Sequence, residues 1–221
     1  MTRLAVLGAA QVSACGAGIG ALAAGLERVP PKPEWVAISR SEDSPRAPVL
    51  RARPDGIDEV VPPRPVRRLD SFAKNFIYTA MLAVADSGRE LPPPERIGVV
   101  TGTAYASLVT SFALLDDIIF EGDESGSPFK FTTAVNNASA TSVATVLDAR
   151  GPCLSVLGFQ DILINVLRVA STWLDEDRAD LVIAGAGDEF HPMVGYGLSH
   201  LGGWAEDGVM RPLDFSARTY V

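Results

Sequence analysis

Cysteine and histidine are scarce in this sequence, which has two of each among 221 residues. Cys15 and Cys153 are too few for the disulfide framework of a small secreted fold. Asp188, Glu189 and His191 lie close together, but such a cluster, with no second half elsewhere in the chain, more often faces solvent than binds a metal. The sequence therefore predicts no metal ion and no other cofactor.

Positive charge and long apolar runs are also limited. The net charge is −8, and phosphate binding requires concentrated basic side chains. The densest basic stretch is interrupted by Pro65 and Asp70 and consists of Arg64, Arg67, Arg68 and Lys74. Glycines break the apolar N-terminal region before it reaches the about 20 residues of a spanning helix. These limits predict a cytoplasmic protein that binds neither nucleic acid nor membrane.

Apolar residues make up 47% of the chain and charged residues 21%, which is enough for a buried core. Short apolar runs predict strands at residues 4–7, 97–100, 154–157 and 181–184. Helical spacing of apolar or small residues predicts helices at 16–26, 70–84, 108–119, 132–149 and 162–173. Alternating strands and helices predict an α/β fold with parallel strands covered by helices.

A proline-rich stretch interrupts this alternation. Residues 29–66 hold nine of the sixteen prolines and show little periodicity. We expect a long surface excursion there, with one strand near residues 49–51.

Three motifs with catalytic or binding potential have stronger structural interpretations. The glycines of residues 16–20 do not follow a strand directly, so a close-packed helix is favoured over a dinucleotide site. Residues 197–201 lack the final glycine of a nucleophile elbow. Cys153 begins an apolar strand, where a thiol is usually inert packing.

Residues 151–161 are the most informative segment, with the sequence Gly-Pro-Cys-Leu-Ser-Val-Leu-Gly-Phe-Gln-Asp. The pattern predicts a strand, a tight turn and a helix. A residue at that turn lies at a helix N-terminus, where backbone N–H groups lower a thiol's pKa and stabilise an oxyanion. An acyl-transfer enzyme would place its nucleophile here, but this chain has Gln160, a neutral amide that cannot attack a thioester.

The sequence resembles the N-terminal half of a β-ketoacyl synthase. The similar segments follow in order along the chain: residues 67–73, 128–137 with 149–152, 179–189, and Arg-Pro-Leu-Asp at 211–214. This resemblance implies a thiolase-like fold, N-terminal half only, as a layered α-β-α arrangement with a mixed sheet. It also implies a single domain over residues 1–221 that includes the proline-rich excursion.

In this resemblance Gln160 takes the place of the family's active cysteine. The exchange is characteristic of chain length factors, the inactive partners of ketosynthases in type II polyketide systems, and also of decarboxylating ketosynthases that initiate chains. Phe159, Asp161, Ile162 and Leu163 are large where the family has small residues. The chain also stops near Val221, before the family's catalytic histidines and glycine-rich turn, and this favours the inactive subunit. By analogy, the shortened form resembles relatives in pathways that make reduced or polyene chains.

Three alternatives remain at this point. The chain could decarboxylate a malonyl-carrier protein with Gln160, or be a condensing enzyme completed in trans. A free-standing acyl-binding module is a third, and it requires stable monomers.

The resemblance further implies partners: an active ketosynthase in an obligate heterodimer, and an acyl carrier protein that holds the growing chain. A lone half-domain would expose a large apolar surface. The expected dimer interface is an antiparallel strand pair formed by Cys153, Leu154, Ser155, Val156, Leu157 and Phe159. Arg64, Arg67 and Arg68 could meet the carrier protein, although a solvated face or an internal ion pair is the commoner role of such a stretch.

The resemblance also implies that the helix at 106–120 lines the acyl-chain tunnel. The candidates for the tunnel floor are Tyr105, Thr110, Ser111, Phe112 and Leu115. Apolar residues at helical spacing, such as Phe112 and Leu115, are equally expected in a plain core.

Overall fold

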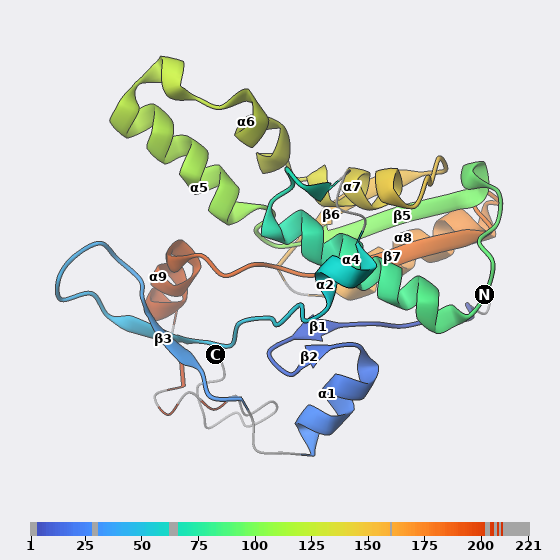
Figure 1. Cartoon of the computed structure of the whole chain (residues 1–221), viewed down its shortest axis with the longest axis horizontal. Coiled ribbons are helices and arrows are strands. Elements are labelled where there is room, and N and C mark those ends of the chain that lie inside the picture. The colour runs from blue at the N-terminus through green and yellow to red at the C-terminus, as the bar shows by residue number, and fades with distance from the viewer. Residues whose placement is uncertain are drawn as a thin grey trace. The chain divides into compact units, whose positions relative to one another are not determined.

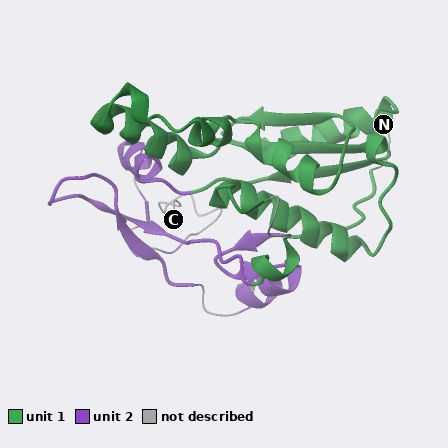
Figure 2. Ribbon diagram, turned by 45° about the horizontal axis from the view of Figure 1, so that its top comes forward, with its two compact units in different colours: residues 1–10, 56–189 green, residues 11–55, 190–221 purple. Residues whose placement is uncertain are grey.

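The computed structural model describes residues 4–27, 31–61, 66–159, 161–201, 204, 205, 207 and 209. Three predicted features, Arg64, Gln160 and the motif at 211–214, lie outside the described residues. The chain forms two compact units: unit 1 comprises residues 1–10 and 56–189, and unit 2 comprises 11–55 and 190–221 (Figure 2). Among the described helices, none is both long enough and apolar enough to cross a membrane.

A three-stranded parallel sheet forms the centre of unit 1 (Figure 1). Strand β5 (Ile97–Thr103) is buried along its whole length between β6 (Cys153–Leu157) and β7 (Leu181–Ala186). Three of the four strands predicted from apolar runs, and their parallel direction, are therefore confirmed. The antiparallel strand that a mixed sheet requires is not among the strands described here.

Helices cover both faces of this sheet. Helix α8 (Ile162–Asp175) packs Val166, Ala170 and Trp173 around Val100 of β5. Gly102 lets α8 approach closely, because a Cβ there would lie 2.6 Å from Val166 Cγ2.

The residue that follows Val100 on β5 faces the opposite side, since successive strand residues point to opposite faces. There Thr101 Oγ1 lies 3.1 Å from Ser139 Oγ on α7 (Ala138–Val146). Helix α4 (Ser71–Ser87) packs on α7, and the carboxylate of its N-cap residue Asp70 accepts a hydrogen bond from Ala73 N–H. The layers of unit 1 are therefore helix, sheet and helix.

Two antiparallel helices project from unit 1 beside the sheet (Figure 1). Helix α5 (Leu108–Asp116) continues into a π-helical turn, η2 (Asp117–Glu121), and a 3₁₀ turn, η3 (Asp123–Ser125), before α6 (Pro128–Ala134). We call residues 108–134 the arm. The helix predicted at 132–149 is in fact two helices, α6 and α7, with a break between them.

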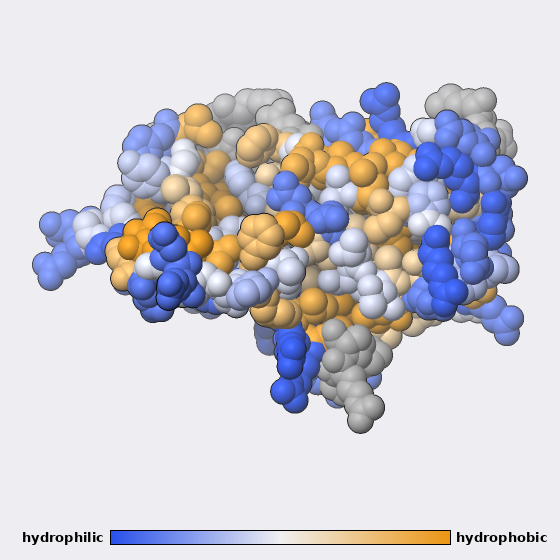
Figure 3. Space-filling view, turned by 90° about the horizontal axis from the view of Figure 1, so that it is seen from above, coloured by the Kyte–Doolittle hydropathy of each residue, from blue (hydrophilic) through white to orange (hydrophobic). Residues whose placement is uncertain are grey.

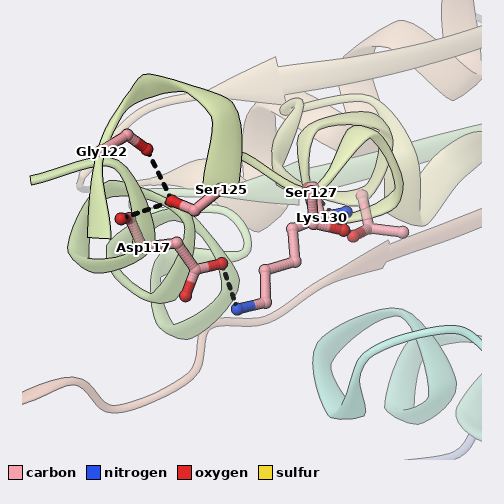
Figure 4. Close-up of polar contacts among 6 residues, drawn as sticks. Asp117, Gly122, Ser125, Ser127 and Lys130 are labelled. Atoms are coloured by element: carbon pink, nitrogen blue, oxygen red, sulfur yellow. Dashed lines mark hydrogen bonds and ion pairs between the residues drawn. The ribbon is translucent and has the colours of Figure 1, made fainter. Parts of the chain in front are cut away.

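Polar contacts close the tip of the arm (Figure 4). Lys130 Nζ lies 2.6 Å from Asp117 Oδ2, and Ser125 Oγ donates to the carbonyl oxygens of Asp117 and Gly122, at 2.6 Å each. These contacts join the end of α5 to the start of α6, so the arm has a defined internal structure.

The segment predicted as a buried strand at residues 4–7 is not a strand. Leu4, Val6 and Leu7 are exposed, Val6 to 82%. The chain instead follows α4, where Ala9 N–H donates to the Asp86 carboxylate at 2.9 Å. An apolar run forms a strand only if a neighbouring strand accepts its backbone hydrogen bonds, and none of the described strands does so here.

Unit 2 contains two small antiparallel sheets. Strands β1 (Val12–Ser13) and β2 (Gly16–Ala17) precede helix α1 (Ile19–Leu26). The helix predicted at 16–26 is therefore confirmed only from Ile19, because Gly16 and Gly18 have positive φ angles and lie outside it. Strands β3 (Glu34–Ala37) and β4 (Arg46–Val49) pair in the proline-rich region.

The single strand expected near residues 49–51 is thus displaced, and its partner β3 was missed. Pro48 pairs with Trp35 within this ladder, and prolines of this kind hide the alternation that marks a strand. Helix α9 (Pro192–His200) approaches the β3–β4 sheet at Gly195, where a Cβ would lie 2.6 Å from Ile38 Cγ2. One short helix, α2 (Ile57–Val60), and a 3₁₀ turn, η1 (Pro94–Arg96), belong to unit 1.

Candidate functional site

The chain turns sharply between β6 and α8, at the corner that the sequence predicts for a nucleophile. Strand β6 ends at Leu157 and α8 begins at Ile162, so residue 160 belongs to the short connection between them. Gly158 N–H donates to the Thr103 carbonyl at 3.2 Å. Asp161, the N-cap of α8, has a left-handed backbone with φ of 57°. The predicted order of strand, turn and helix is confirmed, although Gln160 itself is not described.

Two aromatic rings meet beside this corner. Tyr105 follows β5 and Phe159 follows β6, and the parallel strands bring both positions to the same edge of the sheet. The ring centroids lie 5.5 Å apart at an interplanar angle of 75°, an edge-to-face contact. Phe159 is 75% exposed. One tunnel candidate and one interface candidate therefore contact each other next to position 160.

The other tunnel candidates lie on α5. Thr110 Oγ1 donates to Asp70 Oδ2 at 2.8 Å, and Ser111 Oγ donates to the Ser107 carbonyl at 2.9 Å. Phe112 is half-buried, whereas Leu115 is 47% exposed. Thr110 and Ser111 thus help to hold the helix, and Leu115 faces outward.

The interface candidates form an edge strand. β6 is the last strand in the sheet order, so its outer edge has no partner among the strands described. Along it, Leu154 is 44% and Leu157 53% exposed, while Ser155 Oγ lies 2.8 Å from Thr101 Oγ1 beneath the sheet. Cys153 is exposed, so the packing role predicted for it is not confirmed. Partial desolvation raises the pKa of its thiol, which keeps it protonated.

Further apolar side chains surround this edge. We define the β6 patch as the exposed residues Leu154, Leu157, Phe159, Leu163, Ile164 and Leu167. Helix α8 contributes three of them, all on its first two turns. A view from above shows that apolar side chains gather on this side of unit 1 and on the arm (Figure 3).

Asp188 and Glu189 hold the base of the arm, by which we mean residues 103–109. The sequence predicts these two carboxylates to face solvent. Asp188 Oδ1 accepts hydrogen bonds from Thr103 Oγ1 at 2.5 Å and from the backbone N–H groups of Ala104 and Tyr105 at 3.0 Å each. Glu189 Oε1 accepts from Val109 N–H at 2.8 Å. The sequence signal that could have located them is their position directly after a buried strand.

Burial raises the pKa of Glu189 to about 7, and the nearby carboxylates of Asp70 and Asp188 act in the same direction. The hydrogen bond from Val109 N–H opposes this shift but does not outweigh burial. Within the described part of the chain, no three His, Cys, Asp or Glu side chains are grouped so as to hold a metal ion. The acidic groups at the base of the arm act as hydrogen-bond acceptors.

Residues 55–221 match the family model described as β-ketoacyl synthase, N-terminal domain. The chain belongs to this family. A Streptomyces virginiae protein named polyketide β-ketoacyl synthase 1 is 31% identical over 141 residues, which make up 60% of this chain and 33% of that protein. The matched range runs through parts of both compact units, so the expectation of one domain over residues 1–221 stays a prediction.

Solved ketosynthase structures share the fold. A β-ketoacyl synthase from Burkholderia phymatum superposes with a TM-score of 0.78 and 17% identity, over all of this chain and 56% of that one. The structure named the ishigamide ketosynthase/chain length factor gives a TM-score of 0.69 and 22% identity, over 91% and 56%. The thiolase-like ketosynthase fold is therefore confirmed, and this chain spans about a third of its curated ketosynthase relative and just over half of each structure.

Proposed function

We propose that this chain is a non-catalytic subunit of the chain length factor type, which pairs with an active ketosynthase and shapes the tunnel for an acyl chain on a carrier protein. The observation that carries the proposal is a glutamine at position 160, between β6 and α8. A helix N-terminus activates a thiol by stabilising its thiolate, but an amide has no proton to lose near neutral pH and does not attack thioesters.

The aromatic contact beside the corner supports the same conclusion. A covalently held acyl group needs space next to its point of attachment. Here the rings of Tyr105 and Phe159 meet next to that position. Small side chains would leave this space open, so the pair argues against an acyl-enzyme intermediate on this chain.

The β6 patch supports pairing with another protein. Large exposed apolar side chains that gather around one strand are typical of a protein interface, and an edge strand also offers unpaired backbone N–H and C=O groups. A partner that adds an antiparallel strand along β6 satisfies both needs. The structure named the ishigamide ketosynthase/chain length factor has a similar fold, which makes a ketosynthase the partner we propose.

A role in chain length follows if the arm lies along the tunnel that the two proteins share. Phe112 and Leu115 then set how far the chain extends, because their side chains are large and apolar. Arg67 and Arg68 are exposed and remain our proposed contacts for an acidic carrier protein.

Co-expression with a neighbouring ketosynthase tests the proposal. We expect a heterodimer on size-exclusion chromatography that extends acyl chains on the carrier protein, with acyl groups found only on the partner by intact-protein mass spectrometry. Gln160→Ala should leave extension largely unchanged. If the chain alone releases carbon dioxide from malonyl-carrier protein, and Gln160→Ala stops this release, the chain is a decarboxylase and the proposal fails.

A further inference from the structure

The first turn of helix α5 has no hydrogen bond from its N-cap side chain, although the N-cap residue is a serine. Ser107 occupies the N-cap position, but its hydroxyl caps no backbone N–H. That hydroxyl is buried, and it has no hydrogen-bond partner within the described residues. The first N–H groups of a helix need acceptors from elsewhere when the N-cap side chain does not supply one.

Glu189 supplies one of these acceptors from a distant part of the chain. Its carboxylate accepts a hydrogen bond from Val109 N–H, in the first turn of α5, at 2.8 Å. The positive end of the helix dipole favours a negative charge here, but burial and the carboxylates of Asp70 and Asp188 outweigh it, since the pKa of Glu189 is raised. Asp70 holds the same turn through Thr110 Oγ1 at 2.8 Å, and Asp188 holds the preceding residues 103–105.

The arm depends on this attachment because α5 packs mainly along α6 and η2 rather than on the sheet (Figure 1). A change at the base therefore moves the whole arm, including Phe112 and Leu115. Asp188 is exposed and retains its hydration, whereas Glu189 is half-buried.

The groups that face Glu189 from neighbouring elements, Asp70 at the start of α4 and Asp188 after β7, are both acidic. We infer that Glu189 is a positioning residue for the arm, and that its loss of a proton loosens the base of α5. Ionised Glu189 is half-buried beside two like charges, and entry of water at the start of α5 relieves their repulsion.

The pKa of Glu189 places this change near neutral pH. Because burial raises that pKa to about 7, the side chain is mostly protonated at about pH 6 and mostly ionised at about pH 8. A neutral carboxyl group still accepts the hydrogen bond from Val109 N–H through its carbonyl oxygen. The base of the arm is therefore firm at the lower pH and looser at the higher one.

Amide hydrogen exchange of the full chain tests the inference. After correction for the intrinsic pH dependence, protection of peptides within residues 105–120 should fall by about threefold or more between about pH 6 and about pH 8. Glu189→Gln keeps an acceptor but cannot ionise, so its protection should not change with pH. Glu90→Gln, at an exposed site after α4, is the matched control and should behave like the wild type.

Helix α8 provides an internal reference, so the wild type alone is decisive if Glu189→Gln does not fold. The inference is overturned if protection of residues 105–120 is independent of pH, if α8 loses protection to the same extent, or if folded Glu189→Gln keeps the wild-type dependence. The role of the arm in chain length rests on the proposed function and is tested separately. Product lengths that do not respond to substitutions of Phe112 or Leu115 would count against that function, not against the attachment.

Discussion

At the scale of single residues, glycines in the central strand show how closely α8 lies on the sheet. Gly98 and Gly102 both face this helix, and a Cβ at Gly98 would lie 3.1 Å from the Trp173 ring. At Gly102 the distances to Val166 and Ile162 would be 2.6 and 2.7 Å. These values are below van der Waals contact, so an added methyl group must displace α8. The same helix starts at the corner that contains residue 160.

We predict that Gly102→Ala destabilises unit 1 by about 1–3 kcal/mol through this overpacking. Gly185→Ala is the matched control, because Gly185 lies on the neighbouring strand β7 and a Cβ there meets nothing within 4 Å. Urea unfolding followed by circular dichroism measures both variants. Equal free energies of unfolding for the two variants would show that α8 does not lie as close to β5 as described.

A second residue-scale prediction concerns the hydroxyl cluster under the sheet. Thr101 Oγ1 contacts both Ser139 Oγ and Ser155 Oγ. Thr101→Val keeps the shape but leaves the buried Ser139 hydroxyl without this partner, which should cost about 1–3 kcal/mol. Thr101→Ser keeps the hydroxyl, and in the same urea experiment it should recover much of that loss. A stable Thr101→Val variant would show that the cluster contributes little.

At the scale of elements, the apolar pattern predicted most helices and strands of unit 1. It failed where pairing with a distant segment determines whether a strand forms. β5, β6, β7, α4 and α8 were all predicted, because the strands are short apolar runs and the helices carry apolar residues at helical spacing. Strand β3 was missed, and residues 4–7 were wrongly predicted as a strand. Pairing with another strand, rather than apolar content, determines whether an extended segment joins a sheet. The break between α6 and α7 occurs within a run of small residues that show weak periodicity.

The edge of β6 gives the element-scale prediction. Leu154→Asp together with Leu157→Asp places two charges on the exposed edge, so we expect loss of the ketosynthase complex with little change in the fold. Sedimentation or size-exclusion analysis of the co-expressed proteins measures the outcome. Val6→Asp, at an exposed apolar residue outside the β6 patch, is the control and should leave the complex intact. Retention of the complex by the double variant would remove β6 from the interface.

At the scale of the whole molecule, the acidic composition sets the net charge, but one half-buried carboxylate, Glu189, sets a specific pH dependence. The pKa of Glu189 is raised to about 7 from an ordinary value of 4.5, so the folded chain holds this proton over a pH range in which the unfolded chain has lost it. The contribution of Glu189 to stability is therefore largest below the lower value and declines as pH rises toward the higher one.

We accordingly predict that the free energy of unfolding decreases between about pH 5 and pH 7 more steeply in the wild type than in Glu189→Gln. The difference between the two proteins isolates this side chain from the other carboxylates. Thermal or urea unfolding across this pH range measures it. Parallel curves for the two proteins would mean that Glu189 is solvated in the folded chain.

The sequence by itself determined the order of the main elements, the resemblance to ketosynthases and the glutamine at the corner between β6 and α8. Each of these depends on residue identity or on local spacing, which are readable along the chain. Only the tertiary structure decided that residues 4–7 stay outside the sheet and that Glu189 caps α5. Glu189 and Val109 are 80 positions apart, and no local pattern records a hydrogen bond that forms only when the fold brings such distant segments together.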